Sequence, residues 1–417
     1  MPLKEIFATV NFILAICGYQ FVTTLFLPMS DDVEVATRMV TVPFRIVSLF
    51  VTITTIILHL RNVQQLPISL KLFLVYWGVM ICRIFYDLNI NPDIAVIGSY
   101  KTFVYIWTLV CLSYAISTLL SFNSINFSVA FKTCYIVLLV TLLMTMLGNE
   151  MMFEEDVEGR LDGNVALNTI SFGHTGVTLA ILAMWSLFRS KGLLSKIFHL
   201  VVFAIGFFIM LRAGSRGPFV AMLGVIIFYM LSKMRNKMIA IMSFIAISLF
   251  LYINYEFILD MIGQISPVME QRLGNSIYSN DSSGRDNLMD YAFYGVAENP
   301  LFGKSFAIPM RTGEMYYPHN YFVEALMSCG IIIGGMFILL NLYAILTSSK
   351  IIEYKLAYGW VALLFVQKFF HGMFSGAIYL NYDFSILMIL DLILIYNMSR
   401  TANVNTDTKI YAHLFRT

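Results

Sequence analysis

The sequence predicts an all-α polytopic membrane protein with about twelve transmembrane helices, and three observations lead to this prediction. The 417 residues are 59% hydrophobic and only 12% charged, and the mean hydropathy is +0.77, whereas a soluble domain is about half apolar and about a quarter charged. Apolar stretches of the ~20 residues needed to cross a bilayer recur along the chain. Basic residues gather in alternate short loops, as expected when orientation follows the positive-inside rule.

The predicted spans are helices because unpaired backbone groups are not tolerated in lipid. The first stretch is long for a signal peptide and lacks an obvious cleavage site, so we expect it to be retained as the first helix. No internal repeat is visible, and we expect residues 1–417 to form a single transmembrane helical bundle. The twelve predicted spans are 6–27, 40–60, 68–87, 97–120, 129–148, 165–188, 195–211, 217–232, 237–255, 320–347, 355–372 and 382–398.

The loops that carry positive charge all lie on one side of this arrangement, which we predict to be cytoplasmic, with both termini on the same side. The opposite loops are acidic at 31–34 and 150–163 and are expected to be solvated. The second of these lacks the organised ligand spacing of a metal site. The basic residues that set the orientation are Arg61, Arg189, Lys191, Lys233, Arg235, Lys237, Lys350, Lys355 and Arg400.

The segment 256–319 is the only long loop, and it is predicted to face outward, on the periplasmic side. It is too long for a simple connector. Ser282 or Ser283 can cap a short amphipathic helix that stops at Asn299 and Pro300. We expect this helix to lie against the outer surface of the bundle, through a face that contains Leu288, Tyr291, Ala292 and Phe293.

Several classes of site are not indicated. The five cysteines are scattered through apolar stretches without a CxxC pair, so we interpret them as small hydrophobic residues. The chain has no zinc-protease motif, P-loop or dinucleotide fingerprint. It also has no basic tract of the kind that binds nucleic acid. We therefore expect no nucleic-acid partner, no cofactor and no metal.

Arg212 and Arg216 lie between the seventh and eighth predicted helices, on the outer side, where few cations are expected. Ser215 is a good N-cap and Pro218 fits the first turn of a helix. A helix N-terminus favours an anion, and guanidinium groups bind phosphate oxygens bidentately. The pair therefore predicts a phosphate or pyrophosphate site. The alternative is that one arginine reaches the lipid head groups while the other pairs with an acidic loop.

Further ionisable residues lie near the outer ends of predicted spans. Such residues are costly in a membrane and by default indicate function, although each one alone could equally be structural. Together they indicate an anionic substrate that enters from the outer side. They are Arg45, Arg83, Lys101, Lys368 and His371.

A second cluster of candidates lies in and after the long loop. Arg285 begins the predicted loop helix, and His319 and Asn320 begin the tenth span. The positive end of that helix and the nearby arginines favour a neutral imidazole, so His319 is a candidate general base. The alternatives are a capping role for His319 and, for Glu324, a favourable charge near the helix N-terminus.

His174 lies in the middle of the sixth span beside Asn168, Thr169 and Ser171. This polar face is expected to look into the bundle. It either lines a cavity or bonds to a neighbouring helix, and we favour the second alternative.

These motifs together resemble the O-antigen ligase and polymerase family. The resemblance lies in Ser215-Arg216 at a helix start and in "SGR" at Ser283 to Arg285. It continues with Asn299-Pro300 followed by Gly303, and with His319-Asn320 before an apolar helix that contains Glu324 and Gly330. It covers roughly 210–340, and the first two hundred residues match only in hydropathy. Each motif is short, so the order and spacing of the set carry the resemblance.

The resemblance implies a metal-independent, inverting glycosyltransferase in the bacterial inner (plasma) membrane. Its donor would be an oligosaccharide linked to undecaprenyl pyrophosphate. Arg212, Arg216 and Arg285 would stabilise the leaving pyrophosphate, Arg45, Arg83 and Lys101 would assist in substrate binding, and His319 would orient or deprotonate the acceptor hydroxyl. Asn320, Glu324, His174, Lys368 and His371 form a supporting set.

The acceptor distinguishes two activities within the family. A polymerase of O-antigen or a related surface polysaccharide transfers to a second lipid-linked repeat unit, and a ligase transfers to lipid A core. We favour the polymerase because such sequences are highly variable and poor in motifs. Its implied partners are membrane lipid and a chain-length regulator protein of the pathway.

A flippase or transporter of lipid-linked oligosaccharide is the main alternative from another class. It should show two related halves and helices broken at the midplane, and the sequence shows neither. A non-catalytic membrane scaffold would leave the outward arginines without a role.

Overall fold

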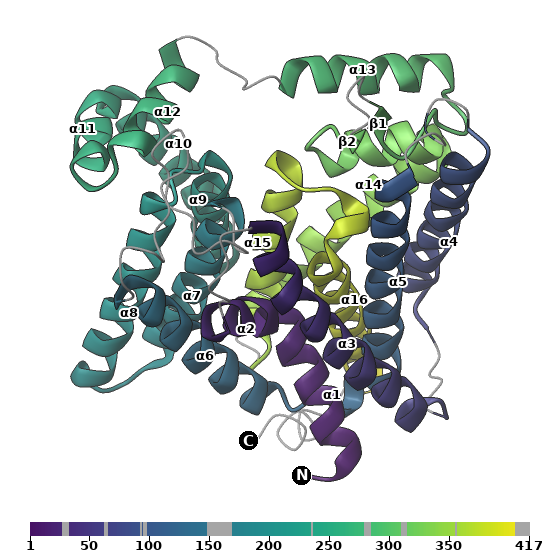
Figure 1. Ribbon diagram of the computed structural model, residues 1–417. Coiled ribbons are helices and arrows are strands. Elements are labelled where there is room, and N and C mark those ends of the chain that lie inside the picture. The colour runs from purple at the N-terminus through teal and green to yellow at the C-terminus, as the bar shows by residue number, and fades with distance from the viewer. Residues whose placement is uncertain are drawn as a thin grey trace. The chain divides into compact units, whose positions relative to one another are not determined.

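A computed structural model describes residues 1–26, 33–61, 66–91, 94, 98–147, 169–234, 237–278, 285–309, 315–354 and 357–404 (Figure 1). These residues fall into two compact units, which are considered separately. Unit 1 comprises Met1–Leu58, Ser121–Asp281 and Ala357–Gln367, and unit 2 comprises His59–Leu120, Ser282–Leu356 and Lys368–Thr417. The single bundle expected over 1–417 stays a prediction.

Helices make up nearly all of both units, which confirms the all-α prediction. Unit 1 contains α1 (Leu3–Ile13), η1 (Leu14–Gly18), α2 (Tyr19–Leu25), α3 (Val33–His59), η2 (Phe122–Ser124), α6 (Phe127–Leu147), α7 (Thr169–Arg189), α8 (Leu193–Arg212), α9 (Arg216–Lys233), α10 (Lys237–Ile253), α11 (Tyr255–Ile265) and α12 (Pro267–Tyr278). Unit 2 contains α4 (Ile68–Asn89), α5 (Gly98–Ser121), α13 (Arg285–Glu298), β1 (Ile308–Pro309), β2 (Met315–Tyr316), α14 (Tyr321–Glu353), η4 (Ile378–Leu380) and α16 (Tyr382–Val404). Helix α15 (Gly359–Phe374) contributes residues to both.

Each of the twelve predicted spans coincides with helical structure. Nine helices in the described ranges are long and apolar enough to cross a membrane, and a bent pair would make ten. That pair is formed by Ile241–Ile253 and Tyr255–Ile265, which meet at 74°. Helix α15 has only 16 residues. The chain is thus a multi-pass membrane protein, and the count of twelve spans and the placement of both termini stay predictions.

Helix α7 forms the core of unit 1, because the fourteen consecutive residues from Phe172 to Trp185, together with Thr169, are buried. It packs closely on α8 where Gly176 faces Gly206. A β-carbon on Gly176 would lie 2.7 Å from the Gly206 carbonyl oxygen, so only a residue without a side chain permits this approach. Small residues at helix crossings of this kind drive packing in lipid, where the hydrophobic effect between helices is absent.

Helix α14 packs against α4 and α16 in unit 2. The Tyr76 ring of α4 stacks on Phe337 of α14 at 4.2 Å between centroids. Helix α14 is interrupted at Gly330, where φ is 71° and ψ is 179°. The segment that follows α13 occupies this break, since Ile331 donates its backbone N–H to the Pro300 carbonyl at 2.7 Å.

The segment predicted as one long loop, 256–319, contains α11, α12, α13 and the short antiparallel pair β1–β2. Figure 1 shows α13 lying across the β1–β2 pair and the start of α14. The stretch predicted as the loop helix forms α13. Its Leu288, Tyr291 and Ala292 pack on Ile308, Val323 and Met327. The assignment of Phe293 to this face is wrong, because its side chain is 53% exposed and Val296 packs instead. The predicted caps Ser282 and Ser283 lie outside the described residues.

Replacing Gly330 by alanine should destabilise the protein. The left-handed backbone costs about 1–3 kcal/mol for a residue with a side chain, and the new β-carbon would overlap the Leu301 carbonyl. Gly335→Ala is the matched control in the same helix, because nothing lies within 4 Å of that position; there alanine should stabilise by up to about 1 kcal/mol. Thermal unfolding in detergent measures both variants, and an equal midpoint for the two would contradict this account of the break.

Candidate functional site

The C-terminal end of α15 is the point in unit 2 where two of the predicted site residues meet. Arg285, the first residue of α13, donates from Nη1 to the Phe374 carbonyl at 2.8 Å. Asn320, which begins α14, donates from Nδ2 to the Met373 carbonyl at 3.3 Å. Carbonyls at a helix C-terminus have no partner within the helix and carry partial negative charge, so both contacts are favourable. The structure therefore brings the starts of α13 and α14 to one place.

His319 is held between these elements in an uncommon conformation. Its φ of 56° is positive, and no other described residue apart from glycine shares this feature. Its ring lies 4.5 Å from that of Tyr317, and its Nδ1 has no hydrogen-bond partner in the described part of the chain. Burial and, to a smaller extent, the positive charge of Arg285 lower the pKa of His319 to about 4. The imidazole is therefore neutral at physiological pH and can accept a proton.

Asn320 and Glu324 fix the first turn of α14. The Asn320 Oδ1 accepts the backbone N–H groups of Phe322 and Val323 at 3.0 and 3.2 Å, which is an N-cap. Glu324 is fully buried, and both of its carboxyl oxygens lie 3.0 Å from the Ile378 backbone N–H. This contact joins α14 to η4, so the geometry of Glu324 is that of a structural residue.

Lys368 and His371 lie one turn apart on α15. The Lys368 ammonium forms an ion pair with the Asp383 carboxylate at the start of α16. The His371 carbonyl accepts the Ser375 N–H at 2.7 Å in the last turn of α15. Both residues thus lie on the helix whose C-terminal end Arg285 and Asn320 contact.

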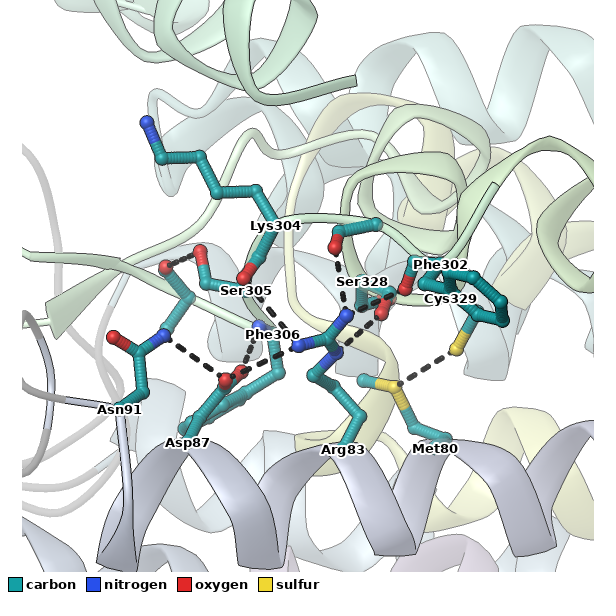
Figure 2. Close-up of polar contacts among 12 residues, drawn as sticks. Met80, Arg83, Asp87, Asn91, Phe302, Lys304, Ser305, Phe306, Ser328 and Cys329 are labelled. Atoms are coloured by element: carbon teal, nitrogen blue, oxygen red, sulfur yellow. Dashed lines mark hydrogen bonds and ion pairs between the residues drawn. The ribbon is translucent and has the colours of Figure 1, made fainter. Parts of the chain in front are cut away.

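Arg83 of α4 makes a dense set of bonds to backbone carbonyls, which Figure 2 shows. Its Nε donates to the Ser328 carbonyl at 2.9 Å and its Nη2 to the carbonyls of Phe302 and Gly303. Its Nη1 lies 3.5 Å from the Asp87 carboxylate one turn further along α4. Asp87 is fully buried and accepts the backbone N–H of Phe306 at 2.7 Å. A pyrophosphate contact by Arg83 would require these bonds to break, and it stays a prediction.

In unit 1, Arg212 and Arg216 border a very short turn. Helix α8 ends at Arg212 and α9 begins at Arg216, with Ser215 at the N-cap position and Pro218 in the first turn, as predicted. The Ser215 side chain makes no capping bond. Gly214 has a φ of 60°, which suits the reversal of the chain. Arg212 donates from Nη1 to the Ile265 carbonyl of α11 at 3.4 Å.

The remaining predicted residues lie on separate helices. Arg45 lies on α3 of unit 1 and Lys101 on α5 of unit 2, and both are half-buried. His174 is buried on α7. Its carbonyl accepts the side-chain N–H of Gln367 at 3.0 Å, and Gln367 also bonds to Thr178. This polar face therefore bonds to a neighbouring helix. The predicted neighbour Asn168 lies outside the described residues.

Two carboxylates of unit 2 were missed by the sequence reasoning. Asp87 stands four residues after Arg83 in the same span, a spacing that places both on one helix face and signals an ion pair. Asp383 gives no comparable signal, because its partner Lys368 is on another helix. No group of three histidine, cysteine, aspartate or glutamate side chains suited to a metal occurs within the described ranges.

Comparison with known proteins gives one match. Residues 200–340 match the family model described as O-antigen ligase. This segment is about a third of the chain and includes Arg212, Arg216, Arg285, His319 and Glu324. Searches among curated proteins and among solved structures found no match. The match confirms the resemblance noted from the motifs: this membrane protein carries, at residues 200–340, a domain of the O-antigen ligase family.

Proposed function

We propose that this protein polymerises oligosaccharide repeat units linked to undecaprenyl pyrophosphate, on the outer face of the bacterial inner membrane. The single observation that carries the proposal is the position of His319 inside the matched segment. A neutral imidazole with an unpartnered nitrogen, next to Arg285, suits a group that receives a hydroxyl proton.

The reaction transfers a glycan from a pyrophosphate to a hydroxyl. The acceptor oxygen attacks the anomeric carbon of the donor from the face opposite the leaving group, so the configuration inverts. The bond between the anomeric carbon and the phosphate oxygen breaks, and its electron pair stays on the pyrophosphate. The hydroxyl proton passes to His319 and then to solvent. No metal ion or cofactor enters the balance.

In this proposal, stabilisation of the leaving pyrophosphate lowers the activation barrier more than proton transfer to His319 does. Arg216 stands at the N-terminus of α9 and Arg212 at the end of α8. The helix N-terminus and the two guanidinium groups favour an anion, and guanidinium binds phosphate oxygens bidentately. We assign this role to Arg212, Arg216 and Arg285, with Arg45 and Lys101 as further residues that attract the donor.

The role of His319 follows from its pKa. A group with a pKa near 4 is a weak base at pH 7, since general-base catalysis is most effective when the pKa is close to the working pH. We therefore propose that His319 chiefly orients the acceptor hydroxyl and accepts its proton late, after charge has moved to the pyrophosphate. The Tyr317 ring, 4.5 Å from the imidazole, holds it in place.

Polymerase and ligase share this donor chemistry and differ only in the acceptor. We favour the polymerase for the reason given from the sequence, that polymerases are poor in motifs. A chain-length regulator would then be a partner in the membrane. The reaction below separates the two activities.

The purified protein in detergent, mixed with a synthetic polyprenyl-pyrophosphate repeat unit and EDTA but no nucleotide sugar, should produce a ladder of lipid-linked oligomers. The lipid-linked unit supplies both donor and acceptor, and the chemistry needs no divalent ion. Gel electrophoresis and mass spectrometry detect the products. A product formed only after addition of lipid A core would identify a ligase. No transfer to either acceptor would contradict an enzyme and favour transport.

Arg216→Ala should reduce polymer formation by about 10²–10³-fold while the protein level is retained, as when one group that stabilises developing charge is lost. Arg216→Lys should recover part of the activity, because it restores the charge without the bidentate fork. Arg189→Ala is the matched control. Arg189 is the last residue of α7, and its guanidinium lies over the Trp185 ring. Normal polymer in Arg216→Ala would remove the pyrophosphate assignment.

The rate should stay level as the pH falls from 7 to 5 and drop only through about pH 4. Only the neutral imidazole accepts a proton, and the lowered pKa of His319 keeps this form populated to about pH 4. In Arg285→Gln the pH at which the rate falls should rise towards the ordinary histidine pKa of about 6.5. It should move only part of the way, because burial is the larger cause of the lowered pKa. His199→Gln serves as a control for a histidine outside the proposed site, on α8. A wild-type rate that halves near pH 6.5 would contradict this role.

A further inference from the structure

The segment Asn299–Gly303, which follows α13, exchanges backbone hydrogen bonds with α14. In an uninterrupted helix Ile331 would donate to the Met327 carbonyl. Instead Ile331 donates to the Pro300 carbonyl at 2.7 Å, and the Met327 carbonyl accepts the N–H of Lys304 at 2.7 Å. The break at Gly330 therefore releases one donor and one acceptor of α14, and Pro300 and Lys304 provide their partners.

Arg83 binds further backbone carbonyls around this exchange. Its guanidinium reaches the carbonyls of Phe302 and Gly303 on the incoming segment and of Ser328 on α14 (Figure 2). Asp87 accepts the N–H of Phe306, three residues after the segment, at 2.7 Å. The carbonyls of Pro300, Phe302 and Gly303 thus all have protein partners, and partners of this kind are the condition for irregular backbone at membrane depth.

The depth of this turn follows from the helices that bind it. Arg83 lies six residues before the last residue of the candidate span Ile68–Asn89, which is about 9 Å of helix. Ser328 lies seven residues after Tyr321, the first residue of α14, which is about 10 Å. Both anchor points therefore lie inside the outer ends of two candidate spans.

The side chains at the tip of the turn are apolar and exposed. Leu301 is 56% and Phe302 79% exposed. The side chains that follow the break in α14, Ile331 and Ile332, are also apolar and exposed, and the Ile331 N–H bonds to the Pro300 carbonyl of the turn. Lys304 draws its charge away from the tip, because its ammonium pairs with Glu298 and lies 5.0 Å from the Tyr294 ring.

We propose that Leu301 and Phe302 insert into the outer leaflet and contact lipid acyl chains, so that Asn299–Gly303 is a re-entrant turn. Lipid is the occupant that fits, because the tip lies beside the exposed apolar side chains that follow the break in α14, carries no charge, and has the carbonyls of Pro300, Phe302 and Gly303 bonded to protein. The turn would anchor α13 at the membrane surface. This inference does not depend on the proposed reaction.

Spin labels test the insertion. In a Cys82→Ser background, which removes the exposed cysteine, Phe302→Cys and Leu301→Cys are labelled with a nitroxide and the protein is reconstituted in phospholipid vesicles. Collision rates with oxygen, which concentrates in lipid, and with a water-soluble nickel chelate give the depth of each label. Ile332→Cys, 65% exposed on α14, is the lipid reference, and Asn287→Cys, exposed on α13, is the water reference.

The labels at 301 and 302 should behave like the label at 332, with an oxygen-to-nickel ratio several-fold above that at 287. A ratio equal to that at 287 would place the tip in water and overturn the proposal. Low accessibility to both reagents would mean that protein covers the tip, which would overturn it as well.

Discussion

The requirement that backbone groups find partners inside a bilayer governs the architecture around α14. At Gly330 the chain takes a conformation with φ of 71°, and the regular ladder of helix hydrogen bonds stops. In water such a break could be hydrated, but in lipid it must be closed by protein. The turn after α13 closes it, and the Arg83 guanidinium bonds to the carbonyls that remain. The position of the segment between α13 and β1 in unit 2 depends on this closure.

The candidate site depends on the same closure through α14. His319 and Asn320 stand at the beginning of the half-helix that ends at Gly330, and Glu324 ties that half-helix to η4. Arg285 and Asn320 both reach the end of α15, so the start of α13 is fixed relative to the start of α14. A network of side-chain to backbone bonds therefore sets where the imidazole lies. Few of these bonds join two side chains, and the positions of the helix ends matter more than any one ion pair.

Periodic and compositional features of the structure were predictable from sequence. The apolar stretches predicted the long helices, and Ser215 with Pro218 predicted the start of α9. The helical sequence pattern that follows Gly284 and ends at Asn299 and Pro300 predicted α13. Features that rest on pairing between distant residues were not. Arg83 was interpreted as a ligand for an anion, because nothing in its span reveals that its partners are carbonyls more than two hundred residues away. Phe293 was placed on the packed face of α13 because helical periodicity predicts which residues lie on a buried face only to within a residue or two. The ninth predicted span ends at residue 255, next to the break at Asn254, but helix α11, which follows the break, was interpreted as part of the long loop.

The backbone conformation of His319 lowers the stability of the fold, whereas its side chain is the one that the proposed chemistry needs. A left-handed conformation costs a residue with a side chain about 1–2 kcal/mol, and it costs glycine or asparagine less. Either residue would suit the turn before α14 better than histidine does. Under the role proposed for His319, the chain gives up stability at this position in return for the imidazole. Selection for a more stable protein alone would therefore tend to remove the very side chain on which acceptor recognition is proposed to depend.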